Sequence, residues 1–130
     1  MNYAVRYYSR SGNTKGIADA FANELGVDAI SAESKAAEIN EEVDMLFIGG
    51  ALYAYGIDDH LARFIERLQS DKVKKAVIFS TSWISKHAIE LIRESLEEKG
   101  IAVEDESFYS RGKPSTKDLE KAAKFAKNYK

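Results

Sequence analysis

Residues 9–14 have the side chains and the sequence position of a phosphate-binding loop. The preceding segment, Tyr3–Tyr8, is rich in aromatic and β-branched residues, which predicts a strand. Ile17, Phe21 and Leu25 then recur at the spacing of one helix face. Where a strand turns directly into a helix, the free N–H groups of the first helical turn and the helix dipole attract an anion. The context therefore predicts an anion site between the strand and the helix.

The chemistry of the loop strengthens this interpretation. Ser9, Ser11 and Thr14 offer three hydroxyl donors, and Gly12 allows the backbone to bend close to a bound group. An ordinary helix N-cap, supplied by Asn13 or Thr14 alone, is the alternative. Three hydroxyls and a glycine in six residues exceed what a cap needs. The candidate phosphate ligands are therefore Ser9, Arg10, Ser11, Gly12, Asn13 and Thr14.

The elements that position this loop are predicted from hydrophobic periodicity. Further strands are expected at Val27–Ile30, Val43–Ile48 and Lys75–Thr81, with a fifth inside Ile101–Tyr109. A brief helix is expected around Ser34–Ile39. Longer helices are marked by Leu61, Phe64, Ile65 and Leu68, by Ile89, Ile92 and Leu96 before Gly100, and by Leu119, Ala122, Ala123 and Ala126. Strands and helices thus alternate along the whole chain.

This alternation predicts an α/β fold with three layers and a doubly wound, five-stranded parallel sheet of order 2-1-3-4-5. A closed barrel would need eight strands. The length of 130 residues predicts one domain, residues 1–130. A hydrophobic fraction of 45% with one proline is typical of a compact chain.

Ligands of such sheets bind beyond the carboxyl ends of the strands, at the switch point between strands 1 and 3. The loops after strands 3 and 4 place two tyrosines and the only tryptophan there, with Ile84 following. A flat aromatic ligand with a phosphate tail fits this arrangement, whereas rings that only cap the sheet edge are the alternative. The candidate residues are Gly50, Ala51, Leu52, Tyr53, Ala54, Tyr55, Gly56, Thr81, Ser82 and Trp83.

Composition excludes several classes of function. Without cysteine, the chain has no disulfide, thiolate metal site or thiol nucleophile, and we expect no metal. The net charge of −2, from 19 basic and 21 acidic residues, argues against a nucleic-acid surface. The lack of a long apolar run or a signal-like start predicts a cytoplasmic protein that does not enter a membrane.

No constellation of residues predicts covalent or acid–base catalysis, so we assign no catalytic residue. His60 and His87 stand at helix starts without a carboxylate and hydroxyl beside them. The segment Ser80–Ser82 lacks the Gly-x-Ser-x-Gly elbow of hydrolases. A phosphoacceptor receiver domain needs acidic residues where this chain has Ser9 and Gly49.

Arg6 is unusual because it stands in the middle of an interior strand. A buried guanidinium needs a carboxylate partner or an escape to the end of the sheet. We therefore expect one of these two arrangements.

The segment Tyr7–Thr14 resembles the flavodoxin signature, a strand followed by Ser/Thr-x-Ser/Thr-Gly-Asn-Thr. The spacing to the apolar strand ending at Gly49–Gly50 is similar too, and the likeness covers essentially the whole chain. The resemblance implies FMN, with its phosphate at residues 9–14 and its isoalloxazine ring between the two later loops. It further implies a monomeric short-chain electron carrier with transient redox partner proteins. In the family a peptide of the strand-3 loop flips on reduction, and Ala54–Tyr55 and Tyr55–Gly56 are the candidates here.

Two other functions remain open at this stage. The chain also resembles FMN-dependent reductases of a quinone or a porphyrinogen, through the Gly-x-x-x-Tyr-x-Tyr-Gly pattern of residues 49–56. A flavodoxin-like interaction module without cofactor is the third possibility. The sequence shows no separate nicotinamide site, which favours the electron carrier over the reductase.

Overall fold

The computed structural model describes residues 1–83 and 85–130. Along these residues the strands are β1 (Tyr3–Tyr7), β2 (Ala29–Ser31), β3 (Met45–Gly49), β4 (Lys75–Thr81), β5 (Ala102–Val103) and β6 (Phe108–Ser110). The helices are α1 (Asn13–Leu25), α2 (Asp59–Arg67), α3 (His87–Glu98) and α4 (Thr116–Lys127), with short 3-10 turns η1 (Lys35–Ala37) and η2 (Ser70–Lys72). The alternation predicted from the sequence is confirmed.

The parallel sheet has the order β2-β1-β3-β4-β5, and β6 also pairs with β4. The predicted order 2-1-3-4-5 is therefore confirmed. β4 has the predicted bounds, whereas β2 begins two residues later than predicted and β3 begins at Met45. Val43, predicted as part of that strand, forms only an isolated bridge with Val73.

The predicted fifth strand is divided into β5 and β6, which pair with different parts of β4. Three consecutive acidic residues, Glu104 to Glu106, lie between the two pieces. Charged side chains have low strand propensity, and they interrupt the pairing here. β6 nevertheless continues in the same direction and brings residues 111–115 to the carboxyl end of the sheet.

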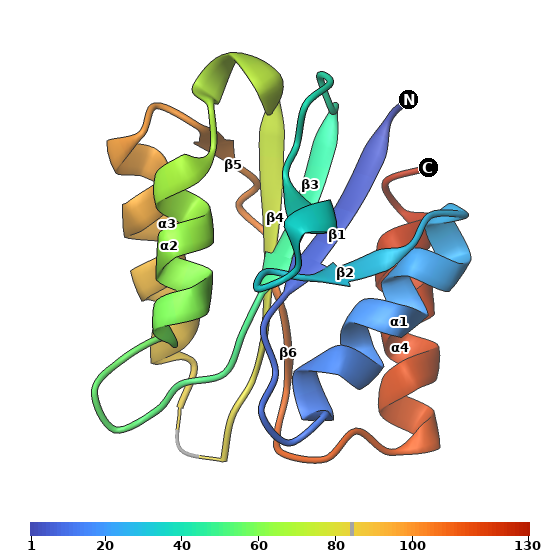
Figure 1. Cartoon of the computed structure of the whole chain (residues 1–130). Helices are drawn as coiled ribbons and strands as arrows, with labels where there is room; N and C mark the ends of the chain where they lie inside the picture. Colours follow the sequence, from blue (N-terminus) through green and yellow to red (C-terminus); the bar gives the residue numbers. More distant parts are fainter. Residues whose placement is uncertain (84) are drawn as a thin grey trace.

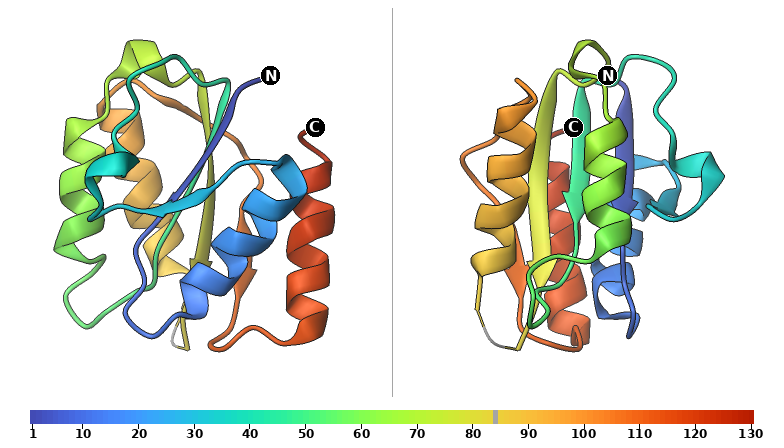
Figure 2. Two further views of the ribbon diagram at one scale, coloured as in Figure 1. Left: turned by 45° about the vertical axis from the view of Figure 1, so that its right-hand side comes forward. Right: turned by 60° about the vertical axis from the view of Figure 1, so that its left-hand side comes forward.

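Helices cover both faces of the sheet, with α1 and α4 on one side and α2 and α3 on the other (Figures 1 and 2). One core packs between the sheet and α1 and α4, and it is centred on Phe21 and Phe47. The other core contains Leu46, Phe64 and Ile92. Every residue of β3 is buried, because this central strand has helices on both faces.

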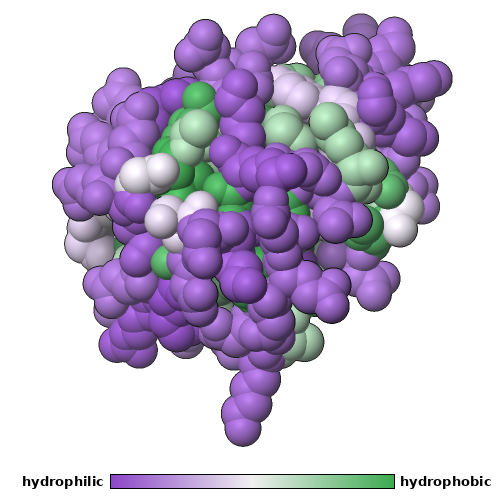
Figure 3. Space-filling model, turned by 90° about the horizontal axis from the view of Figure 1, so that it is seen from above, coloured by the Kyte–Doolittle hydropathy of each residue, from purple (hydrophilic) through white to green (hydrophobic). Residues whose placement is uncertain are grey.

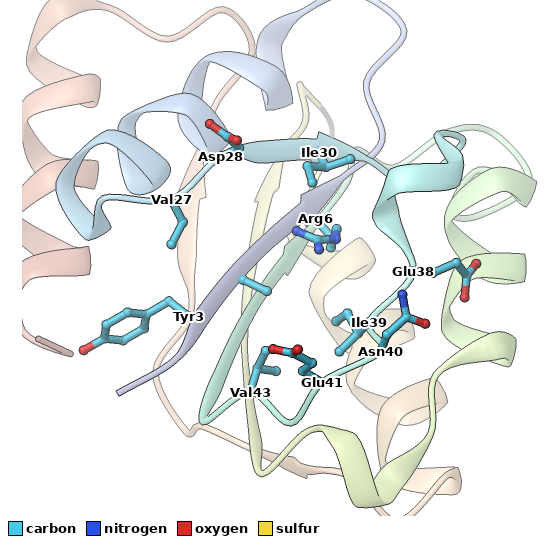
Figure 4. Close-up of a pocket in the computed structure, with 11 residues that line it drawn as sticks. Tyr3, Arg6, Val27, Asp28, Ile30, Glu38, Ile39, Asn40, Glu41 and Val43 are labelled. Carbon is cyan, nitrogen blue, oxygen red and sulfur yellow. The ribbon is translucent and has the colours of Figure 1, made fainter.

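Arg6 has neither of the arrangements expected from the sequence. It is buried, and its Nε and Nη1 donate to the carbonyl oxygens of Ala37 at 2.7 Å and Val5 at 3.1 Å. Figure 4 shows its guanidinium at a cavity of about 270 Å³ that Glu38 also lines. Glu38 instead pairs with Arg67 at 2.6 Å. Burial lowers the pKa of Arg6, and backbone carbonyls rather than a carboxylate satisfy its hydrogen bonds.

The two ends of the sheet differ in what they carry. Both chain termini lie at the amino ends of the strands, and the loops that follow β1, β3 and β4 lie together at the opposite end (Figure 1). Figure 3 looks onto the end with the termini, where hydrophilic side chains cover most of the surface. In the described part of the chain, no helix is long and apolar enough to cross a membrane.

Candidate functional site

The loop between β1 and α1 is shaped by Gly12, which has a φ of +93°. This left-handed conformation favours glycine, and it turns the chain into the helix. The Ser9 hydroxyl accepts a hydrogen bond from the Gly12 N–H at 2.9 Å, and the Ser11 hydroxyl accepts one from the Asn13 N–H at 3.4 Å. Gly12 itself is the N-cap residue, without a side-chain cap bond. The alternative in which Asn13 or Thr14 caps the helix is therefore wrong.

The start of α1 is open to an anion. Its first turn contains no acidic residue. Thr14 and Lys15 are first-turn residues, so their N–H groups have no acceptor within the helix. The Lys15 ammonium lies 2.7 Å from Asp19, one turn further along the helix, and this contact raises the pKa of Lys15. The helix end thus offers uncommitted donors and partial positive charge to a phosphate.

Thr14 joins the loop to the sheet. Its hydroxyl lies 2.7 Å from the hydroxyl of Thr81, at the end of β4, and both residues are buried. A hydrogen bond between two buried hydroxyls fixes the distance between the first turn of α1 and the carboxyl end of β4. Thr14 is therefore part of the frame of the site.

A cavity of about 300 Å³ opens between the loops that follow β1, β3 and β4. Tyr53 and Trp83 belong to the loops on two of its sides, and we call this cavity the slot. Nine predicted residues line it, namely Arg10, Ser11, Asn13, Ala51, Leu52, Tyr53, Thr81, Ser82 and Trp83, together with Gly112. Ser11 and Asn13 also line an adjoining hollow beside Lys113 and Pro114, so the slot and the phosphate loop are continuous.

The remaining predicted residues do not line the slot. They are Ser9, Gly12, Thr14, Gly50, Ala54, Tyr55 and Gly56, which lie next to the lining residues in the sequence. Gly50, for example, accepts a hydrogen bond from the buried Ser80 hydroxyl through its carbonyl oxygen, at 2.7 Å. Ile84, which the sequence places in the loop after β4, lies outside the described residues.

Gly112 is a slot residue that the sequence analysis missed. A Cβ atom at this position would lie 2.3 Å from two ring atoms of Trp83, so the indole packs directly on the glycine backbone. The sequence signal that could have identified it is the position of this glycine shortly after the last predicted strand. Because the carboxyl ends of parallel strands share one edge, this glycine belongs with the other loops of the site.

Residues 53–56 form a tight turn at the rim of the slot. The Tyr53 N–H donates to the Gly56 carbonyl oxygen at 2.7 Å, and the Gly56 N–H donates to the Tyr53 carbonyl oxygen at 3.0 Å. The Ala54–Tyr55 peptide is therefore the centre of the turn. The Tyr55 side chain is 63% exposed, which excludes a role for this ring in the core.

Arg10 connects the phosphate loop with the loop after β3. Its Nε and Nη2 lie 3.0 and 2.6 Å from Oδ2 of Asp58, and Nη2 also donates to the hydroxyl of Tyr55. The guanidinium carbon lies 3.9 Å from the centre of the Tyr53 ring, a cation–π contact. One side chain thus fixes both tyrosines of the rim relative to the phosphate loop.

Asp58 is the buried anchor of this arrangement and the N-cap of α2. Its Oδ1 accepts hydrogen bonds from the backbone N–H of His60 and contacts the His60 ring nitrogen Nδ1, both at 2.8 Å. Burial acts to raise the pKa of Asp58, but the bonds from His60 and Arg10 outweigh it and hold the pKa below its usual range. The His60 ring stacks on Tyr8, with ring centres 4.7 Å apart. The carboxylate is therefore ionised and bonded on both oxygens.

The fold and the slot together define a doubly wound α/β protein with a cavity between the loops at the carboxyl ends of its strands. The family model described as a flavodoxin domain matches residues 4–126. The chain belongs to the flavodoxin-domain family.

The chain is also similar to individual proteins and solved structures. The chain is 25% identical to the uncharacterized protein MJ0298 of Methanocaldococcus jannaschii over 89% of each chain. A flavodoxin from the domain Archaea has a similar structure, with a TM-score of 0.76 and 27% identity, over 98% of this chain and 95% of that one. Oxidised flavodoxin 1 of Bacillus cereus is similar in fold, with a TM-score of 0.77 and 24% identity, over 97% of this chain and 95% of that chain.

Proposed function

We propose that this protein binds FMN and carries single electrons between redox partner proteins, which it meets transiently as a monomer. The observation that supports this most directly is the slot between Tyr53 and Trp83, which is continuous with the phosphate loop. Membership of the flavodoxin-domain family supports the same cofactor. The bound flavin would supply the redox chemistry, and the chain would bind it, orient it and limit its contact with water.

The donor set of the loop suits a phosphate. The Ser9 and Ser11 hydroxyls, which accept from the Gly12 and Asn13 N–H groups, precede a first turn of α1 that contains no acidic residue. Hydrogen bonds to a charged group contribute about 1.5–3 kcal/mol each. We therefore expect FMN to bind far more tightly than riboflavin, which has the same ring without the phosphate.

The aromatic residues suit the ring. Tyr53 is half-buried and has the Arg10 guanidinium over its ring, while Trp83 packs on Gly112. Aromatic stacking contributes about 0.5–1.5 kcal/mol beyond the area that it buries. The exposed Tyr55 and Trp83 lie at the rim, so the edge of a bound ring would be accessible to a partner protein.

The turn of residues 53–56 provides a movable backbone acceptor beside the slot. Its central peptide, Ala54–Tyr55, lies between the two hydrogen bonds that close the turn. A flip of this peptide rotates ψ of Ala54 and φ of Tyr55, and the two closing bonds can stay in place because they belong to Tyr53 and Gly56. We propose Ala54–Tyr55 as the peptide that responds to the redox state of the flavin.

Titration of the apoprotein with FMN and with riboflavin tests cofactor binding. We expect strong binding of FMN alone, with quenching of Trp83 fluorescence, because this is the only tryptophan. Equal affinities, or unquenched emission at saturation, would contradict the proposed site.

Stepwise reduction of the FMN complex with dithionite tests electron carriage. We expect a radical that is detectable by electron paramagnetic resonance midway through the titration. A direct two-electron bleach, together with turnover of NAD(P)H and a quinone, would instead identify a small-molecule reductase.

A further inference from the structure

Arg6 differs from the other basic residues in its burial. Among the residues that the structure describes, it is the only buried lysine or arginine, with 9% of its surface exposed. The others are at least partly exposed, so water solvates their charge. Asp58, the other buried charge of this part of the chain, is bonded on both carboxylate oxygens. The Nε and Nη1 atoms of Arg6 donate to two carbonyl oxygens, whereas Nη2 has no hydrogen-bond partner among the described residues.

An arginine buried in this way carries an electrostatic cost. Burial lowers the pKa of Arg6, because the charged form has lost water, and the guanidinium forms no ion pair with any described residue. The carbonyl bonds replace part of the lost hydration, but they bring no full negative charge. A carboxylate placed against Nη2 would supply both an acceptor and the missing counter-charge.

The guanidinium faces the cavity beside β1, which has a volume of about 270 Å³ (Figure 4). We call it the Arg6 cavity. β1 pairs with β3 along its whole length, whereas β2 begins only opposite Val5. The ladder between β1 and β2 thus leaves out Tyr3 and Ala4, and both residues line the cavity. Arg6 is the only cation among the described residues that line it.

The other lining residues are of two kinds. The apolar ones, all buried or half-buried, are Tyr3, Ala4, Val27, Ile30, Ile39 and Val43. The polar ones, all exposed, are Asp28, Glu38, Asn40 and Glu41. Glu38 is paired with Arg67 at 2.6 Å, which leaves the carboxylates of Asp28 and Glu41 to face a ligand. The cavity therefore combines a buried cation, an apolar lining and exposed negative charge.

We propose that the Arg6 cavity binds a free amino acid, with its carboxylate on the Arg6 guanidinium and its ammonium beside Asp28 and Glu41. The fork of an arginine matches the two oxygens of a carboxylate. A simple anion would also meet Arg6, but the two exposed carboxylates would repel it. A zwitterion has a partner for each of its charges, and the apolar lining favours a small apolar side chain.

This site is separate from the slot. No described residue lines both cavities, so the inference does not depend on FMN. The alternative is a purely structural role, in which Arg6 only links η1 to β1 through the Ala37 carbonyl oxygen. A structural arginine would affect stability, but it would not make the chain bind an amino acid.

Isothermal titration calorimetry of the full chain with L-valine, L-leucine and L-methionine tests the proposal. We expect at least one of them to bind with a dissociation constant below about 10 mM. For the amino acid that binds most tightly, the matched probes are the same molecule without its ammonium and without its carboxylate, which for valine are isovalerate and isobutylamine. The carboxylate probe should bind more weakly than the amino acid, and the amine probe should not bind.

Two variants locate the site. R6Q removes the guanidinium and should weaken binding about tenfold or more. The control R63Q removes an exposed arginine of α2 and should leave the affinity unchanged. D28N/E41Q alters only exposed side chains, so it keeps the proposal testable even if R6Q does not fold. This double variant should weaken binding of the amino acid and strengthen binding of the carboxylate probe, because the repulsion of the probe is lost.

Three results would overturn the proposal: no binding of any of the three amino acids, equal affinities of folded R6Q and R63Q, or a carboxylate probe that binds as tightly as the amino acid. The titrations are repeated with saturating FMN, and we expect the same dissociation constants. Competition between FMN and the amino acid would place the amino acid in the slot and would likewise overturn the proposal.

Discussion

Replacement of Asp58 by asparagine tests the anchor that holds the rim of the site. The carboxylate accepts from the His60 N–H at 2.8 Å and from two nitrogens of Arg10 at 3.0 and 2.6 Å. Asparagine has one oxygen, so its amide N–H₂ must face either the backbone donor or the guanidinium. One set of donors would then lose its acceptor in a site where residue 58 is 5% exposed.

The magnitude follows from these contacts. A charge-assisted hydrogen bond contributes about 1.5–3 kcal/mol, and the loss of an N-cap about 1 kcal/mol. Because the Arg10 side chain is 46% exposed, water replaces part of what it loses. We expect D58N to reduce the free energy of unfolding by about 2 kcal/mol at neutral pH.

The pH dependence provides a second, independent check. The hydrogen bonds of Asp58 hold its pKa below the usual range in the folded state. A lowered pKa stabilises the folded state above the unfolded value of about 3.9, and this contribution disappears as the pH falls through the folded value. The stability difference between wild type and D58N should therefore be constant near neutral pH and shrink below about pH 4.

Urea unfolding of the apoprotein, followed by circular dichroism, measures both quantities. The matched control is D59N, since Asp59 is the next residue, is exposed and lies in the first turn of the same helix. It should cost only about 0.3–1 kcal/mol, through the helix dipole. If D58N and D59N were equally stable, or if the D58N difference persisted unchanged at pH 3, the assignment of Asp58 as the anchor would be wrong.

Two further predictions concern the frame of the slot. G112A should weaken FMN binding about tenfold or more, because the new Cβ would displace the Trp83 ring and its stacking on the flavin would be lost. The control is G100A: Gly100 has a similar positive φ, but an added Cβ there has no atom within 4 Å, so this variant should strain the backbone without changing FMN affinity. Equal FMN affinities of the two variants would contradict the packing of Trp83 on Gly112. T81V should reduce the free energy of unfolding by about 1–3 kcal/mol, because the buried Thr14 hydroxyl loses its partner. In urea unfolding, T14V/T81V should reduce the free energy of unfolding by less than the sum of the two single substitutions, and additive losses would refute the hydrogen bond.

The sequence predicted the parts of the structure that depend on local pattern. β4 contains the apolar run Ala76–Phe79 and has helices on both faces, so its position was clear from hydrophobicity. The turn at Gly12 followed from the succession of strand, hydroxyls, glycine and helix. The interruption of the last strand was missed because the position of three acidic residues relative to β4 depends on the whole sheet.

The contacts that organise the site were out of reach for a different reason. Arg10 and Asp58 belong to different loops, and either one alone has the pattern of a solvated surface charge. The packing of Trp83 on Gly112 likewise joins loops from two strands. The partner of Arg6 was unpredictable for the same reason: backbone carbonyl oxygens of Ala37 and Val5 accept its hydrogen bonds, whereas the sequence suggested a carboxylate. Pairwise contacts between loops become visible only when the strand order has brought the loops together.

These contacts also explain how loops without regular structure can hold a site in shape. The Thr14 hydroxyl is bonded to that of Thr81, Arg10 is paired with Asp58, and Trp83 packs on Gly112. Each of these contacts joins segments that follow, or end, different strands of the sheet. A ring bound in the slot would touch all of these loops, and the slot is therefore organised in advance of binding, which reduces the ordering cost that the cofactor must offset. The turn of residues 53–56 is held by its own two hydrogen bonds and by the Tyr55 contact with Arg10, which leaves its central peptide as the part of the rim that can move without disturbing the frame.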